Sequence, residues 1–259
     1  SLNINRPHFY QPTNNLLVYW DTKILRVLHN NKLQSFPNVL MGDFVFGDSV
    51  LGIIDRLDYF HAYYQGRFWE IDQRPITAMA AGDNMLVYVD EADEMVIFKH
   101  GETEVAETEP PIYFEAGCNI VAYIDAYRDL KIYYRGETHK VAQFVEVKGK
   151  SDQGGTVYLD EIPLKAALEN RIIVPGKGHL RQFQTGDDLV AFIDDFESFK
   201  VFDKGEIHDL LDYAPKRYIV EDRMVAFADV DDKFKVYYNG TVETLEIYIP
   251  EKYTLDQNV

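Results

Sequence analysis

The sequence NIVAYIDAYRDLKIYYRG (residues 119–136) predicts two short apolar strands that are joined by an acidic turn and followed by a tighter turn at Gly136. The same pattern recurs along the chain, with successive aspartates 34 or 35 residues apart. A fixed period of this length indicates a repeat protein. The repeat aspartates are Asp21, Asp55, Asp90, Asp125, Asp160, Asp194 and Asp229.

Each repeat contains the pattern of four short strands. The second strand is apolar at every position, as in residues 120–124 and 189–193, so we expect it to be covered on both faces. A glycine follows the third strand eleven residues after the aspartate, and Asn239-Gly240 predicts a type I′ hairpin there. A second group of glycines stands eight residues before the aspartate, where we expect turns that need a positive φ. These glycines are Gly47, Gly82, Gly117 and Gly186.

Side-chain sizes alternate within the second strand. The residue three before the aspartate is small or medium, and the residue two before it is large, so a large side chain of one repeat can pack against a small one of its neighbour. We therefore expect Tyr88, Tyr123, Phe192 and Phe227 to be buried between repeats. Four antiparallel strands per unit favour a β-propeller of about seven blades within one domain, residues 1–259. A β-solenoid is the alternative, but hairpin turns inside each unit argue against it.

The run VAYID (residues 121–125), a short loop and then DLKIY (residues 129–133) resemble the second and third strands of WD40-like and TolB-like bacterial propeller blades. The resemblance covers about six of the seven units and concerns the fold. It implies a β-propeller and names no substrate or partner.

The fifth repeat departs from the others. Residues 162–170 are rich in Ala and Leu and predict a short helix, and the hairpin glycine is absent. Residues 145–185 hold six basic and five acidic side chains in a chain whose net charge is −17. We expect the basic side chains to surround a docking site for a partner, although a decayed blade with no such role is the alternative. They are Lys148, Lys150, Lys165, Arg171, Lys177 and Arg181.

The composition limits the kinds of partner. A net charge of −17 argues against nucleic acid and against anionic lipid, because both are bound through basic side chains. No apolar run is long enough to predict a transmembrane segment, and the single cysteine, Cys118, excludes an internal disulfide. The first residue is Ser1 rather than Met, which together with the bacterial type of blade favours an exported, periplasmic or extracellular location over a cytoplasmic one.

Most repeat aspartates have a second acid three or four residues later. Paired carboxylates can serve glycoside hydrolysis or calcium binding, but these recur in several units, whereas an active site needs one. An aspartate that accepts hydrogen bonds from the turn after it explains the recurrence. We assign this turn role to Asp55, Asp90, Asp125, Asp194 and Asp229.

No catalytic motif, metal-ligand spacing or cofactor fingerprint is present, so we predict no catalytic residue, metal or cofactor. The sequence favours a non-enzymatic interaction or scaffold propeller, an accessory subunit of a larger assembly that could include cell-envelope or membrane proteins. The alternatives are a propeller that binds carbohydrate or another small ligand, and an enzyme with its site at the central channel.

Overall fold

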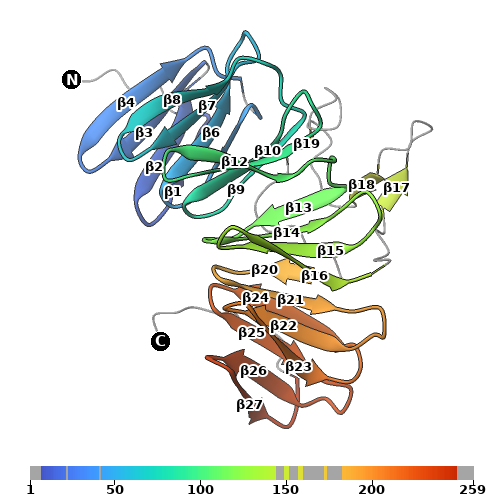
Figure 1. Ribbon diagram of the computed structural model, residues 1–259. Coiled ribbons are helices and arrows are strands. Elements are labelled where there is room, and N and C mark those ends of the chain that lie inside the picture. Colours follow the sequence, from blue (N-terminus) through green and yellow to red (C-terminus); the bar gives the residue numbers. More distant parts are fainter. Residues whose placement is uncertain are drawn as a thin grey trace. The chain divides into compact units, whose positions relative to one another are not determined.

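The structure is a computed structural model that describes residues 7–21, 23–40, 42–143, 149–151, 157–159, 172–173 and 183–249. Every regular element in these ranges is a β-strand (Figure 1). No helix in them is long and apolar enough to cross a membrane. The chain divides into two compact units: unit 1 contains residues 1–110 and 162–176, and unit 2 contains residues 111–161 and 177–259. The prediction of a single domain stays a prediction.

Unit 1 contains three sheets, each with four consecutive antiparallel strands in chain order. The first is β1 (Phe9–Pro12), β2 (Leu16–Asp21), β3 (Ile24–His29) and β4 (Lys32–Pro37). The second is β5 (Phe44–Phe46), β6 (Val50–Ile54), β7 (Phe60–Tyr64) and β8 (Arg67–Asp72). The third is β9 (Ala78–Ala81), β10 (Met85–Val89), β11 (Met95–Lys99) and β12 (Glu102–Glu107), and β19 (Ile172–Ile173) adds a parallel strand to β9.

Unit 2 repeats this arrangement in three further sheets. The first is β13 (Tyr113–Ala116), β14 (Ile120–Ile124), β15 (Leu130–Tyr134) and β16 (Glu137–Ala142). The second is β20 (Phe183–Thr185), β21 (Leu189–Ile193), β22 (Phe199–Asp203) and β23 (Glu206–Leu211). The third is β24 (Arg217–Glu221), β25 (Met224–Ala228), β26 (Phe234–Tyr238) and β27 (Thr241–Glu246). A separate hairpin pairs β17 (Gly149–Ser151) with β18 (Val157–Leu159).

The second strand of each repeat lies inside its sheet, as the apolar pattern predicts. Tyr88, Tyr123, Phe192 and Phe227 are all buried, which confirms the prediction made for these aromatic side chains. The Tyr88 ring lies 4.7 Å from that of Phe60 in the preceding sheet, and the Phe227 ring lies 5.3 Å from that of Phe199. The fourth strands are the most exposed, and β27 is exposed at every residue.

The hydrophobic cores lie between neighbouring sheets rather than inside one sheet. In unit 1, Phe60 and Tyr64 of the second sheet share a core with Leu86, Tyr88 and other residues of the third. The small residue of each second strand makes this packing possible: a Cβ added at Gly52 would meet the Leu86 side chain of the next sheet at 3.2 Å. Each sheet is therefore stable only against its neighbours, which is the property of a repeat fold.

The two groups of turns require glycine for different physical reasons. Gly240 has φ 80° and the preceding Asn239 has φ 49°, which confirms the type I′ turn. The prediction of a positive φ at Gly47, Gly82, Gly117 and Gly186 is wrong, because none of the four has one. A Cβ at Gly47 would lie 1.7 Å from the Gly82 carbonyl oxygen, and one at Gly117 would lie 1.9 Å from that of Gly186. These turns require glycine because the backbones of adjacent sheets nearly touch there.

The predicted fifth blade does not stand between its neighbours. The sheet β13–β16 packs directly on the sheet β20–β23: the Asn119 N–H donates to the Asp187 carbonyl at 3.1 Å, and the Tyr134 and Phe202 rings are 5.8 Å apart. Residues 143–182 therefore form an insertion between two adjacent sheets, which corrects the arrangement of seven consecutive blades. Asp160 and the predicted helix over 162–170 lie outside the described residues.

Candidate docking surface at the turn edge

The turn between the second and third strands is built around the repeat aspartate. In the fifth four-stranded sheet, β20–β23, the Asp194 Oδ1 accepts hydrogen bonds from the N–H groups of Phe196 and Ser198, both at 2.9 Å. The Asp194 carbonyl accepts from the Glu197 N–H at 3.0 Å, and Glu197 has a positive φ of 61°. The carboxylate thus fixes the backbone of the whole turn. The same bonds are formed by Asp55, Asp90, Asp125 and Asp229.

The second carboxylate oxygen pairs with the side chain six residues later. Lys200 Nζ lies 3.1 Å from the Asp194 Oδ2, and Lys235 Nζ lies 2.8 Å from the Asp229 Oδ2. Burial alone raises the pKa of each carboxyl, but the turn N–H groups and the lysine lower it more, so the pKa of Asp194 and of Asp229 lies below its usual value. The remaining pairs of this kind are Asp125 with Lys131 and Asp55 with His61.

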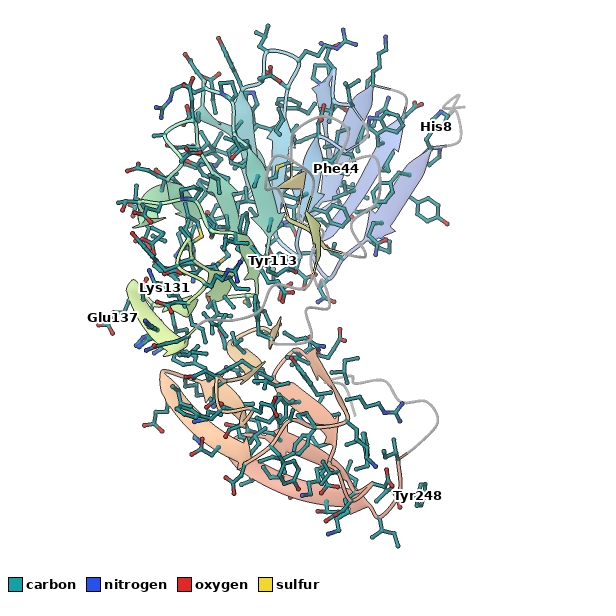
Figure 2. The ribbon with its side chains drawn as sticks, turned by 90° about the vertical axis from the view of Figure 1, so that its right-hand side faces the viewer. His8, Phe44, Tyr113, Lys131, Glu137 and Tyr248 are labelled. Atoms are coloured by element: carbon teal, nitrogen blue, oxygen red, sulfur yellow. The ribbon has the colours of Figure 1, made fainter. Side chains whose placement is uncertain are left out.

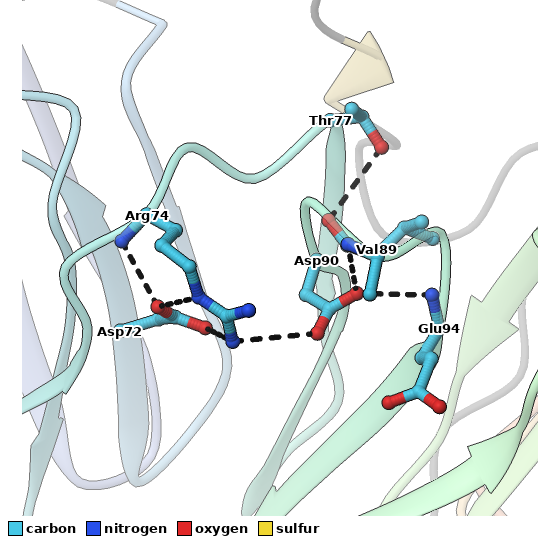
Figure 3. Close-up of polar contacts among 7 residues, drawn as sticks. Asp72, Arg74, Thr77, Val89, Asp90 and Glu94 are labelled. Carbon is cyan, nitrogen blue, oxygen red and sulfur yellow. Dashed lines mark hydrogen bonds and ion pairs between the residues drawn. The ribbon is translucent and has the colours of Figure 1, made fainter.

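Asp90 forms the same turn with a different cation. The residue six positions later is Val96, and the Arg74 guanidinium, from the linker between β8 and β9, lies 3.7 Å from the Asp90 Oδ2 instead (Figure 3). Arg74 also donates two hydrogen bonds to Asp72, both at 3.1 Å. In these five turns, both carboxylate oxygens are therefore used within the fold, which leaves the turn aspartates a structural role rather than a chemical one.

Large apolar side chains stand at the tips of three of these turns. The residue two after the aspartate is Leu57, Tyr127 or Phe196, and its exposure is 69%, 68% and 80% respectively. The N–H of this residue is held by the aspartate, so the backbone is fixed while the side chain points to solvent. Ala92 and Asp231 take this position in the other two turns. The five turns therefore share one backbone structure but differ in the side chain that they expose at the tip.

Strand direction places two of these tips at the end of the sheets where β16 ends and β20 begins. Because neighbouring strands are antiparallel, the turn after the second strand and the linker after the fourth strand lie at the same end of a sheet, here called the turn edge. Elsewhere that linker is short, as in residues 73–77, 108–112 and 212–216. Between β16 and β20 it is replaced by residues 143–182. Tyr127 and Phe196 belong to the two sheets that flank this insertion.

A family model described as a 10-bladed beta propeller domain matches residues 1–170 and 177–259. The chain belongs to this family. The family description gives ten blades, and the described part of this propeller contains six four-stranded ones. No curated protein sequence matches the chain.

Solved structures with a similar fold are distant. They include the CRINKLY WD40 ectodomain of the Arabidopsis thaliana receptor kinase ACR4, at 11% identity, TM-score 0.44 and coverage of 89% of this chain and 83% of that one. Prp20p from Saccharomyces cerevisiae, whose title names binding to Gsp1p and histones, has 8% identity, TM-score 0.43 and coverage of 88% and 70%. The computationally designed Ika8 protein has 15% identity, TM-score 0.41 and coverage of 95% and 75%.

The basic residues singled out in the sequence are not placed by the structure. Lys148, Lys165, Arg171, Lys177 and Arg181 lie outside the described residues, and only the backbone of Lys150, in β17, is described. Their role in docking stays a prediction. The sequence reasoning missed Tyr127 and Phe196, although the recurrence of a large apolar residue two positions after the aspartate was a readable signal.

Glu115 is a buried carboxyl that lies in a first strand rather than in a turn. Its oxygens accept hydrogen bonds from the Tyr113 hydroxyl at 2.7 Å and from the Thr185 N–H of the next blade at 3.2 Å; Figure 2 labels Tyr113 on the same strand. Burial raises the pKa of Glu115 to about 7, against the lowering effect of these hydrogen bonds. Gln184 holds the equivalent position in the next blade and accepts from the Val220 N–H at 2.9 Å. Since a neutral amide does the same at Gln184, we assign Glu115 to joining blades.

Among the described residues, no group of three His, Cys, Asp or Glu side chains is placed to hold a metal ion. The polar groups of this part of the propeller are thus arranged in repeating structural pairs. The features that differ between the described repeats include the apolar tips, which lie at the turn edge, and the linker between β16 and β20, which starts and ends there.

Proposed function

We propose that this propeller is a non-enzymatic protein-interaction module, an accessory subunit of a larger assembly, and that it binds its protein partner through the turn edge of unit 2. The observation that supports this most is the pair of exposed aromatic tips, Tyr127 and Phe196, on adjacent blades. Adjacent sheets pack about 10 Å apart, so one partner can contact both tips. Aromatic side chains held on a rigid backbone are typical of binding hot spots, because little conformational entropy is lost on binding.

The test compares two variants that change the same turn position. Tyr127→Ser with Phe196→Ser removes both tips beside the insertion, and Leu57→Ser removes the tip of a turn in unit 1. Both changes are at exposed positions and should alter the free energy of unfolding by no more than about 0.5 kcal/mol each. Affinity capture from the native source, quantified by mass spectrometry, should lose specific partners with the double variant and retain them with Leu57→Ser. Equal capture by wild type and double variant would exclude the turn edge as the docking surface.

The basic residues of the insertion are a second part of this proposal. Charge reversal at Lys148, Lys150, Lys177 and Arg181 together is expected to weaken the same interaction, because β16 ends and β20 begins at the turn edge that carries the two aromatic tips. Unchanged capture by a well-folded quadruple variant would restrict docking to the aromatic tips. An exported location and contact with a cell-envelope assembly also remain proposals, which fractionation of the native source tests.

A further inference from the structure

The Phe196 tip differs from the other apolar tips in the charge around it. Asp195 and Glu197 precede and follow Phe196, and both are exposed. Neither forms an ion pair with another described residue, whereas the Tyr127 tip stands between Ala126 and Arg128. The tip of the Asp194 turn is thus an aromatic ring between two carboxylates.

The next blade carries the same kind of acidic turn, but its carboxylates are paired. Its turn presents Val230, which is 48% exposed, followed by Asp231 and Asp232. Lys233 lies 3.6 Å from Asp231, and Lys216 pairs with Asp232, so those two carboxylates are neutralised locally. Asp195 and Glu197 have no ion-pair partner in the part of the chain that the structure describes, and they lie in a chain whose net charge is −17.

We propose that the Phe196 tip binds a lysine or arginine side chain of the protein partner, so that the partner presents a basic segment to the turn edge. This inference rests on the proposed function. A cation over an exposed aromatic ring gains about 0.5–1 kcal/mol, and the flanking carboxylates attract the same cation. The net negative charge speeds the approach of a basic partner and disfavours an acidic one, including a second copy of this chain.

The backbone geometry makes the tip a fixed receptor. Phe196 and Ser198 donate to Asp194, and Lys200 holds the other oxygen of that carboxylate and also lies 3.1 Å from Asp209. The turn is therefore fixed before the partner arrives. Binding a cation there requires only the side chains of Asp195, Phe196 and Glu197 to settle, which keeps the entropic cost low.

The chain offers a control turn of the same design. In the Asp90 turn, Glu91 and Asp93 hold the positions that Asp195 and Glu197 hold, but Ala92 replaces the aromatic ring. Glu91→Gln with Asp93→Asn therefore removes two charges at matched positions in a turn without the ring. The test pair is Asp195→Asn with Glu197→Gln, and Phe196→Ser removes the ring and leaves the charges.

The probe is a fluorescein-labelled peptide of alternating lysine and leucine, with a lysine-acetylated version of the same peptide as the uncharged control, titrated into the full chain. We expect Asp195→Asn with Glu197→Gln, and separately Phe196→Ser, to weaken binding by about five-fold or more, as the loss of about 1 kcal/mol implies. The control pair should change it less than about two-fold, and the acetylated peptide should bind more weakly than the basic one. Equal weakening by the test and control pairs would overturn the proposal, because it would show attraction by net charge alone.

Failure of this inference and failure of the proposed function give different results. If Asp195→Asn with Glu197→Gln leaves partner capture unchanged while Tyr127→Ser with Phe196→Ser abolishes it, the turn edge is the docking surface and the basic partner class is wrong. If neither pair affects capture, both proposals are wrong.

Discussion

The repeat aspartate shows how one side chain can set a whole turn. Asp229 is 1% exposed, its Oδ1 accepts from the N–H groups of Asp231 and Lys233, and its Oδ2 lies 2.8 Å from the Lys235 ammonium. Buried carboxylates are tolerated when every lone pair has a partner. This explains why an acidic residue recurs at a fixed period in a buried position without any chemical role.

The Asp229 turn gives a graded prediction. Asp229→Ala leaves two N–H groups and Lys235 without a partner, and should lower the free energy of unfolding by about 3–5 kcal/mol. Asp229→Asn keeps the Oδ1 acceptor and should cost about half as much or less. Urea unfolding at neutral pH measures both, and equal losses would contradict the shared role of the two oxygens. Because the folded-state pKa lies below 3.8, the cost of Asp229→Asn should shrink as the pH falls below that value.

Glu115 predicts a pH dependence in a separate range. Its pKa is raised from 4.5 to about 7, so the folded state binds a proton that the unfolded state has released. This contribution to stability is complete below pH 4.5 and is lost as the pH rises to about 7, by roughly 3 kcal/mol in all. Glu115→Gln should remove that loss, as the natural Gln184 suggests, and so flatten the stability curve between these values. The free energy of unfolding is measured with urea at several pH values. If it falls as steeply between pH 4.5 and 7 in Glu115→Gln as in the wild type, the assignment is contradicted.

At the scale of the strand and turn, most of the structure follows from residue pattern. The continuous apolar second strand predicts burial on both faces, and Asn239-Gly240 predicts its turn, because strand pairing and turn type depend on nearby residues. The role of Gly117 does not follow from the residue pattern, because the sequence does not distinguish a glycine needed for a positive φ from one needed for close backbone approach. The exposed Phe196 was also not predicted, since exposure depends on which end of the sheet the turn occupies.

The close approach of adjacent sheets can be tested at matched glycines. Gly117→Ala would place a Cβ 1.9 Å from the Gly186 carbonyl oxygen and should lower the free energy of unfolding by more than about 2 kcal/mol. Gly136 has φ 86° with open space around its Cα, and Gly136→Asn should cost less than about 1 kcal/mol because asparagine tolerates that backbone. Urea unfolding of the two variants should give this order, and the reverse order would contradict the assignment of Gly117 to close backbone approach.

At the scale of the molecule, spacing alone misled the blade count. Asp160 continues the period of 35 residues, so the sequence predicts a blade around it. The contacts of Asn119 with Asp187 and of Tyr134 with Phe202 instead make β13–β16 and β20–β23 neighbours. An insertion of about one repeat length keeps the period without adding a sheet to the stack. Tertiary contacts between sheets are needed to tell the two apart.

The central claim is that residues 143–182 are an insertion at the turn edge between two adjacent blades. It is tested by replacing them with Asp-Tyr-Ala-Pro-Lys, the linker of residues 212–216, and measuring amide hydrogen exchange in β14 and β21 by mass spectrometry. The account predicts that both strands keep their protection, because their blades already pack on each other and a short linker joins other neighbours. Loss of protection in both strands would show that a blade had been removed from between them, and would contradict the account.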